Sequence, residues 1–330
     1  AYGSIGCTPE EFSRKQSWIS YMLNQMGADV VGFQECFQRQ ALLKIIGSMR
    51  GYRDAEVVMA DETGDQPRVA LLSRYPIEDV EVFDKFPPES IIHVQPKGVY
   101  DKIFLPFDTF SRPVLKADVM IKPFGLVTFY VVHLKSKRPI YYDGESESNP
   151  VDLAKATARS LMLRAAESCA VRSLLMKSLR NQSRPVVVFG DVNDTGNSVT
   201  TRIISGEVPQ HKLSDNVKQS VWDVLLYHVK DIQARRSYQD FYYTHIHNGM
   251  YESLDHIMVS QELVTENPRN VGRVGLVKVF NDHLIDRKFT DERYDKCKSD
   301  HGIVTCTLEL DCDKYRAQQQ GKGANVKKAQ

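Results

Sequence analysis

Several apolar segments of strand length in this chain carry an acidic residue or a histidine at or just beyond one end. Such segments are typical of buried β-strands, which hold the polar side chain at the edge of a sheet. One strand end of this kind is ordinary, whereas a series of them is not. The residues at these positions are Glu35, His133, Asp191 with Asn193, Asp255, and Asp300 with His301. We therefore expect these residues to form one polar site on a sheet-based fold.

The rest of the pattern alternates between strands and helices. Pro9–Gly27 has apolar residues at helical spacing, with Thr8 placed to cap its beginning and Gly27 to end it. Further helices are predicted at 37–49 and, as one long helix or a kinked pair, at 151–179. Strands are predicted at 28–35, 68–73, 114–121, 126–134, 185–189, 254–259, 274–280 and 303–310. Strands with short turns and few helices predict an α/β fold of two packed β-sheets flanked by helices.

The 330-residue chain has 42% hydrophobic residues, enough for a substantial core. Its motifs extend over nearly the whole length and no linker divides it, so we predict a single domain over residues 1–310. Residues 311–330 are charged, glutamine-rich and poor in large apolar side chains, which predicts a disordered tail. No segment is apolar over the length needed to span a membrane. The oligomeric state stays open.

The 43 basic and 42 acidic residues nearly cancel, so binding of a polyanion would depend on local charge. The six cysteines form no CxxC pair, and no histidines at ligand spacing accompany the C-terminal ones, which argues against zinc. This cysteine usage favours a reducing, cytoplasmic compartment. The first residues do not resemble a signal peptide, although an already removed leader stays open.

Each candidate site residue also has an ordinary structural interpretation. Taken alone, Glu35 is typical of a solvated strand end, and the run Gly190-Asp191-Val192-Asn193 is typical of a turn. His133 can be a buried core histidine, and Ser299-Asp300-His301 can be a loop before a strand. Together, however, these residues offer the carboxylate and amide oxygens that hard cations such as Mg²⁺ or Mn²⁺ prefer.

In order, spacing and chemistry, these motifs resemble those of the endonuclease/exonuclease/phosphatase superfamily, which has a DNase I-like fold. The resemblance covers about residues 12–310. It rests on segments Ala28–Glu35, Arg68–Pro76, Val131–Ser136, Val187–Asn193, Leu254–Val259 and Ser299–His301. It implies a divalent-metal-dependent phosphoesterase built on a two-sheet α/β sandwich.

The resemblance also implies roles for individual residues. Glu35 would bind the metal, with Asp300 as a second candidate ligand. Asp191 would orient or deprotonate the attacking water, and Asn193 would hold the phosphate or the transition-state oxyanion. His301, polarised by Asp300 or an equivalent carboxylate, would be the other proton-handling group and a phosphate contact.

Further residues would support this centre. His133 would donate a hydrogen bond to a non-bridging phosphate oxygen, and Asp255 would support the centre from beside it. Arg112 begins a predicted strand at a position where the family often presents a phosphate-binding arginine. Lys135 is a second phosphate-binding candidate, with a solvated loop as the alternative.

The histidines of Thr244-His245-Ile246-His247 alternate on a predicted strand just before Asp255. They can line the substrate cleft or bind a second metal, but a surface hairpin is the more ordinary interpretation. The same holds for Asp282 and His283. We therefore leave both pairs outside the predicted catalytic set.

The resemblance fails at the beginning of the chain. The family normally opens with a strand that carries an asparagine metal ligand, and no such strand precedes the first predicted helix. We favour a sequence that begins inside the domain; missing residues or a replacement ligand are the alternatives. Signatures of inositol polyphosphate 5-phosphatases and of abasic-site endonucleases are also absent, which leaves the substrate open.

Three functions are consistent with these features. The first is a nuclease that hydrolyses phosphodiester bonds, which the local cations favour and the near-zero net charge does not. The second is a phosphatase or phosphodiesterase acting on a phospholipid or a small phosphorylated metabolite. The third is an inactive binding module of the same fold, suggested by the missing asparagine and opposed by the intact Asp191, Asn193, Asp300 and His301.

Overall fold

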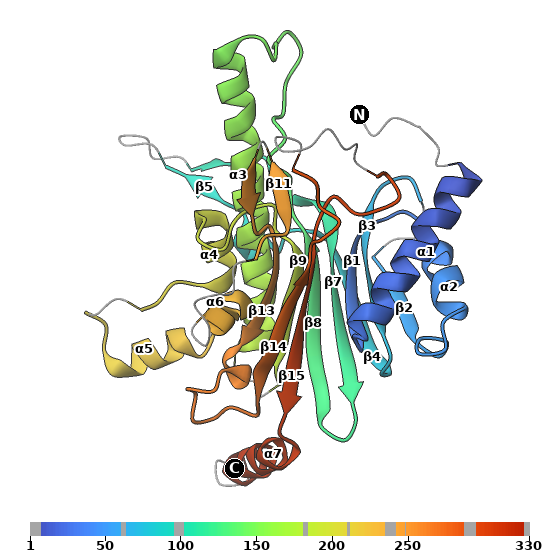
Figure 1. Ribbon diagram of the computed structural model, residues 1–330. Helices are drawn as coiled ribbons and strands as arrows, with labels where there is room; N and C mark the ends of the chain where they lie inside the picture. Colours follow the sequence, from blue (N-terminus) through green and yellow to red (C-terminus); the bar gives the residue numbers. More distant parts are fainter. Residues whose placement is uncertain are drawn as a thin grey trace.

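Two layers of β-strands lie face to face at the centre of the molecule, with helices on their outer faces (Figure 1). The computed structural model describes residues 8–60, 64–95, 102–180, 184–209, 212–234, 242–247, 249–286 and 295–326, with side chains to residue 320. This arrangement is the α/β class with two packed sheets that the sequence predicts. Within the described ranges, none of the helices has the length and apolar character needed to cross a membrane.

The larger layer is a six-stranded sheet. In spatial order its strands are β10 (Leu226–His228), β13 (Asp255–Ser260), β9 (Val186–Asp191), β8 (Gly125–His133), β7 (Thr109–Ile121) and β4 (Ile77–Lys85). β8 and β9 are parallel, and the other neighbouring strands are antiparallel. The chain connects β8 to β9 through α3 (Pro150–Leu179), which is one continuous helix rather than a kinked pair.

Alternation along the strands gives this sheet two apolar faces. On β8, Tyr130 and Val132 pack in the same cluster as residues of α3, such as Ala170. Phe129 and Val131 point to the opposite face and pack against the second layer. The sheet is therefore buried on both sides, which explains why its central strands are almost continuously apolar.

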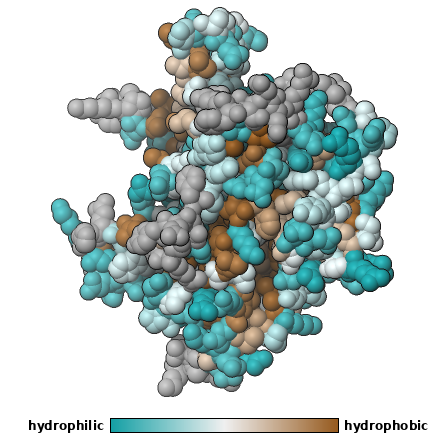
Figure 2. Space-filling model, in the orientation of Figure 1, coloured by the Kyte–Doolittle hydropathy of each residue, from teal (hydrophilic) through white to brown (hydrophobic). Residues whose placement is uncertain are grey.

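The second layer consists of two groups of strands. One has the order β1 (Val30–Cys36), β3 (Arg68–Ser73), β2 (Glu56–Met59), and the other pairs β14 (Gly272–Phe280) with β15 (Ile303–Leu310). Residues of both groups, including Leu71 and Val274, belong to the core shared with the six-stranded sheet. In Figure 1, β8 and β7 are seen between β15 on one side and β1 on the other. Figure 2 shows apolar surface in this middle region.

Two helices cover the outer face of the first group, namely α1 (Pro9–Met26) and α2 (Arg39–Gly47). α1 begins with the predicted cap, because the Thr8 hydroxyl accepts a hydrogen bond from the Glu11 N–H while the Glu11 carboxylate accepts one from Thr8. It ends at Gly27, which has a left-handed backbone conformation. α1 is the first element of the described residues, so the expected asparagine-bearing strand is not among them.

Shorter elements complete the described part. They are η1 (Pro88–Ser90), the hairpin β5–β6 (His93–Val94, Ile103–Phe104), α4 (Val199–Ser205), α5 (Asp215–Trp222), α6 (Val229–Ala234), the hairpin β11–β12 (His245–His247, Met250–Glu252) and η2 (Gln261–Leu263).

The C-terminal segment differs from the expected disordered tail, because it forms helix α7 (Cys312–Val326). The Asp311 carboxylate accepts hydrogen bonds from the N–H groups of Asp313 and Lys314 in the first turn. The ring of Tyr315 stacks on Phe124, with the ring centroids 4.4 Å apart. One aromatic anchor and an N-terminal cap thus hold a segment whose overall composition is polar.

Gly190 is required by the close approach of β9 to β8. Its φ is +139°, and a Cβ atom there would lie 2.0 Å from the carbonyl oxygen of Val132. We expect Gly190→Ala to lower the free energy of unfolding by about 3 kcal/mol, because the obstacle is backbone in a buried sheet. At Gly27 a Cβ would meet no atom within 4 Å, so Gly27→Ala should cost only about 1 kcal/mol for its positive φ. Denaturant unfolding measures both, and equal losses would contradict this account.

Candidate active site

Three neighbouring strands bring their polar end residues together at the upper end of the six-stranded sheet in Figure 1. His133 at the end of β8 pairs with Asp191 at the end of the parallel strand β9. β13 runs antiparallel to β9, so its first residue, Asp255, also pairs with Asp191. The register therefore places an imidazole and two carboxylates side by side, as the strand-end pattern predicts.

His301 joins this row from the segment before β15, in the second layer. Its Nδ1 lies 2.8 Å from Oδ2 of Asp255, at hydrogen-bond distance. Ligand atoms of Asp191, Asp255 and His301 all lie within 4.8 Å of one another. The two layers thus meet at one cluster of titratable side chains.

The electrostatics of this cluster favour sharing of protons. Burial, and then the neighbouring carboxylate of Asp255, raise the pKa of Asp191 to about 7. Burial alone lowers the pKa of His301, but the carboxylates of Asp255, Asp191 and Asp300 outweigh it and raise this pKa to about 10. At neutral pH, His301 is therefore a cation close to a carboxyl group that can gain or lose a proton.

His133 lies next to Asp191 in the sheet and is only 3% exposed. Its Nε2 is 3.4 Å from Oδ2 of Asp191. Burial, together with the positive charges of Arg112 and His301, holds the pKa of His133 well below its usual range. The predicted contact of His133 to a phosphate oxygen stays a prediction, and its imidazole lies beside the carboxylate of Asp191.

Asn193 is placed by a tight turn after β9, where its φ is +57°. Its backbone N–H donates to Oδ1 of Asp191 at 2.7 Å. Its side-chain amide donates to Oδ2 of Asp191 at 3.0 Å and to the Leu134 carbonyl at 2.9 Å. Both side-chain N–H groups are therefore engaged, and Asn193 orients the carboxylate of Asp191. The expected contact to phosphate would need this amide to release a partner.

The two predicted phosphate-binding cations differ in their surroundings. Arg112 is half-buried and donates one hydrogen bond to the Leu134 carbonyl, at 3.1 Å. The ammonium of Lys135 donates to the carbonyls of Ser136 and Arg138 at 3.1 and 3.0 Å, so it is directed into its own loop. Burial and the charge of Arg112 also lower the pKa of Lys135. The geometry thus favours Arg112 over Lys135 as a phosphate contact.

Glu35 and Asp300 are not part of the close group formed by Asp191, Asp255 and His301. Both are exposed, and Glu35 has a φ of +57° at an irregularity in the pairing of β1 with β3. The hydrogen-bond partner of His301 is Asp255 rather than Asp300. Asp255, which we had expected only to support the centre, is therefore the carboxylate that orients His301.

The hairpin β11–β12 contributes residues that we had left outside the catalytic set. The ring centroid of His245 lies 4.8 Å from that of His301. Thr244 anchors the hairpin, because its hydroxyl accepts hydrogen bonds from the N–H groups of Leu254 and Asp255. His283 also reaches the site, with Nε2 2.9 Å from the carbonyl oxygen of His301. The alternating histidines before Asp255 were the signal for His245, but only the fold shows which of them faces the centre.

The donor atoms present fit a divalent cation. Asp255 lies so close to Asp191 that its charge raises the pKa of Asp191. A cation would offset this repulsion, and carboxylate oxygens are the ligands that Mg²⁺ and Mn²⁺ prefer. His301 is a poorer ligand than these two, because its raised pKa keeps the imidazole protonated.

Comparisons with known proteins agree with this fold. Truncated TDP2 of Caenorhabditis elegans superposes with a TM-score of 0.55 at 14% identity, over 92% of this chain and 93% of that one. The mannosyl-6-phosphatase Bt3783 of Bacteroides thetaiotaomicron gives 0.52 at 15% identity, covering 91% and 92%. The human Nocturnin catalytic domain with bound sulfate gives 0.51 at 14% identity, covering 90% and 87%. A search of curated proteins found no significant match.

Fold and comparisons together define a protein with a DNase I-like fold. The family model described as "Endonuclease/Exonuclease/phosphatase family" matches residues 11–301, and the chain belongs to this family. Members of the family are hydrolases that act on phosphate esters. The resemblance deduced from the sequence motifs is thereby confirmed.

Proposed function

We propose that the protein is a divalent-metal-dependent phosphoesterase that hydrolyses phosphodiester bonds, with nucleic acid as its substrate. The observation that carries this proposal is the group formed by buried Asp191 and half-buried Asp255 and His301 at the meeting point of the two layers. It contains a base that titrates near neutral pH and a cationic acid held by a second carboxylate.

In the proposed reaction, Asp191 accepts a proton from water as the water oxygen attacks phosphorus. The bond from phosphorus to the leaving oxygen breaks, and His301 donates a proton to that oxygen. Asn193 and His133 orient Asp191, and Asp255 orients His301. Burial and the contacts to Asn193 and His133 hold the Asp191 carboxylate in one orientation, which suits this role.

Asp191 and Asp255 would hold the metal ion, with Glu35 and Asp300 as further predicted ligands. When bound, a divalent cation polarises phosphoryl oxygens and lowers the pKa of coordinated water. Arg112, which donates a hydrogen bond to the Leu134 carbonyl, would stabilise negative charge on the phosphoryl oxygens.

A second function is favoured by the charge distribution, namely hydrolysis of a phospholipid or a small phosphorylated metabolite. The chain has 43 basic and 42 acidic residues, so no strong overall field attracts nucleic acid. Lys137, near the site, is paired with Glu252 at 3.0 Å and lies 3.9 Å from Asp194. These pairs reduce the local positive charge that a nuclease uses.

A substrate panel separates these functions. The protein is treated with a chelator, supplied with Mn²⁺ or Mg²⁺, and incubated with plasmid DNA, single-stranded DNA, phospholipid vesicles and p-nitrophenyl phosphate. Metal-dependent cleavage of nucleic acid supports the nuclease, whereas release of headgroup or inorganic phosphate alone supports the second function. No turnover of any substrate would favour the inactive binding module.

Arg112 and Lys135 provide a matched pair of cations for testing the phosphate contact. We expect Arg112→Ala to lower kcat/KM about 100-fold, because it removes the cation proposed to stabilise negative charge on the phosphoryl oxygens. Lys135→Ala should change kcat/KM less than about threefold, since its ammonium is bonded within its own loop. Steady-state kinetics on the best substrate of the panel measures both. A larger effect at Lys135 would show that the loop opens to bind phosphate.

A further inference from the structure

Regular pairing between β7 and β8 stops just before the active site. The last regular pair is Leu115 with Val131. In the same register, Pro113 would face His133, and Ser111 would face Lys135. Proline has no N–H to donate, so the ladder of hydrogen bonds cannot continue through this position. Another group must hold the two strands together beyond it.

The carboxylate of Glu167, on α3, occupies this position. One of its oxygens accepts a hydrogen bond from the Ser111 N–H at 2.7 Å, and the other accepts one from the Lys135 N–H at 2.6 Å. The side chain is fully buried, and burial raises its pKa. A single carboxylate therefore bridges two backbone N–H groups that face each other across the opened strands.

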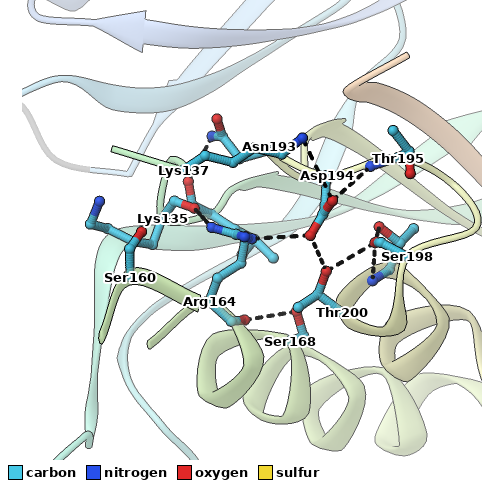
Figure 3. Close-up of polar contacts among 12 residues, drawn as sticks. Lys135, Lys137, Ser160, Arg164, Ser168, Asn193, Asp194, Thr195, Ser198 and Thr200 are labelled. Carbon is cyan, nitrogen blue, oxygen red and sulfur yellow. Dashed lines mark hydrogen bonds and ion pairs between the residues drawn. The ribbon is translucent and has the colours of Figure 1, made fainter. Parts of the chain in front are cut away.

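Arg164 lies one turn earlier on α3 and is only 5% exposed. Its guanidinium donates to the carbonyls of Lys135 and Ser136 at 3.2 and 3.3 Å, and to the carboxylate of Asp194 at 3.4 Å (Figure 3). Asp194 also accepts a hydrogen bond from the Thr200 hydroxyl at 2.7 Å. Arg164 thus connects the loop after β8 with the loop after β9.

We propose that Arg164 and Glu167 are positioning residues that set the spacing between Arg112, the proposed phosphate contact, and Asn193, which orients Asp191. Glu167 binds the residues next to Arg112 and Leu134, and Arg164 binds the residue next to Asn193. This inference rests on the proposed phosphoesterase function.

The Leu134 carbonyl shows why this spacing matters. It accepts hydrogen bonds from both Arg112 and the side chain of Asn193, at 3.1 and 2.9 Å. Glu167 fixes the peptide that contains this carbonyl, because that peptide's N–H belongs to Lys135. A shift of this peptide would therefore displace both Arg112 and Asn193. Displacement of catalytic groups by about 1 Å can cost on the order of 100-fold in rate.

Glu167→Gln tests the bridge with almost no change in side-chain volume. The amide keeps one acceptor oxygen, but its NH₂ group would face a backbone N–H, so one of the two hydrogen bonds is lost. We expect kcat for bis(p-nitrophenyl) phosphate with Mn²⁺ to fall about 10- to 100-fold, with KM changed less than about threefold. Hydrogen exchange at the amides of Ser111 and Lys135 should become faster.

Ser178→Ala on the same helix is the matched control. Its hydroxyl lies 2.7 Å from the hydroxyl of Tyr130, and both side chains are buried away from the site. It should lower stability without changing kcat or exchange at Ser111 and Lys135. Arg164→Lys keeps the positive charge but loses the forked geometry of the guanidinium, so kcat should fall about tenfold. If Glu167→Gln does not fold, Arg164→Lys is used as the test variant in its place.

The outcomes separate the two claims. Metal-dependent turnover by the wild type with unchanged kcat in Glu167→Gln and Arg164→Lys would overturn the positioning role alone. A loss of kcat in Ser178→Ala as large as in Glu167→Gln would also overturn it, because the effect would then follow stability. Absence of turnover by the wild type would overturn the proposed function and the positioning role together.

Discussion

Asp191→Asn is expected to lower metal-dependent turnover about 1,000-fold or more, because the amide cannot accept a proton from water and is a weaker metal ligand. The side chain keeps its shape, and it is buried between neighbours that the structure holds in place. Without metal, the variant should unfold at about the same denaturant concentration as the wild type. It loses a destabilising buried carboxylate next to Asp255, but its NH₂ group must face one of the two Asn193 N–H donors.

The combination of these two results distinguishes a catalytic carboxylate from a structural one. Kinetics with bis(p-nitrophenyl) phosphate and denaturant unfolding in the presence of a chelator measure them on the same preparations. Asn193→Ala serves as a companion variant, because it removes the groups that orient Asp191 while leaving the carboxylate present. We expect a smaller loss of kcat there, about 10- to 100-fold. An active Asp191→Asn protein would rule out Asp191 as the base.

His301→Gln should lower kcat about 100-fold or more, because it removes the cationic acid that Asp255 orients. It should also change how the stability of the metal-free protein depends on pH. The pKa of His301 is about 10 in the folded protein and about 6.5 when unfolded. Between these values the folded state holds a proton that the unfolded state has lost. The resulting stabilisation is complete below pH 6.5 and is lost as pH rises through about 10.

The measurement for this second effect is denaturant unfolding of both proteins in chelator at several pH values from 7.5 to 9.5. Other groups titrate in this range, so the quantity of interest is the difference between wild type and variant. That difference should shrink as pH rises. The charge of His301 lowers the pKa of Asp191, so the two titrations are coupled, and the comparison is repeated in the Asp191→Asn background, where this carboxyl no longer titrates. A difference that stays constant across the range would show that His301 is not held as a cation.

The strands that carry the site residues could be predicted because they are buried and their sequences are therefore mostly apolar. The strands predicted at 126–134, 185–189 and 254–259 agree within two residues at each end with β8, β9 and β13. β4 was missed because it is an edge strand with most of its residues exposed, so its sequence Ile-Glu-Asp-Val-Glu-Val-Phe-Asp-Lys has no apolar run. α7 was missed because its main apolar contact comes from one residue, Tyr315.

The site residues could be predicted as a set, but their partners could not. Asp255 and His301 are 46 positions apart, and only the meeting of the two layers brings them within 2.8 Å. The partners of Glu167 could not be predicted either, because nothing in the sequence distinguishes it from other glutamates in a helix. For Lys135, the sequence predicted a phosphate contact, whereas the structure directs its ammonium to carbonyls of its own loop. No sequence motif indicates these hydrogen bonds.

The most direct test of the central claim is turnover of bis(p-nitrophenyl) phosphate by chelator-treated protein before and after addition of Mn²⁺ or Mg²⁺. A phosphoesterase centred on Asp191, Asp255 and His301 should show no turnover before addition, and turnover that saturates with metal afterwards. The Asp191→Asn protein, purified in parallel, should stay inactive at every metal concentration. Equal turnover with and without metal, or equal turnover by the variant, would contradict this account of the site.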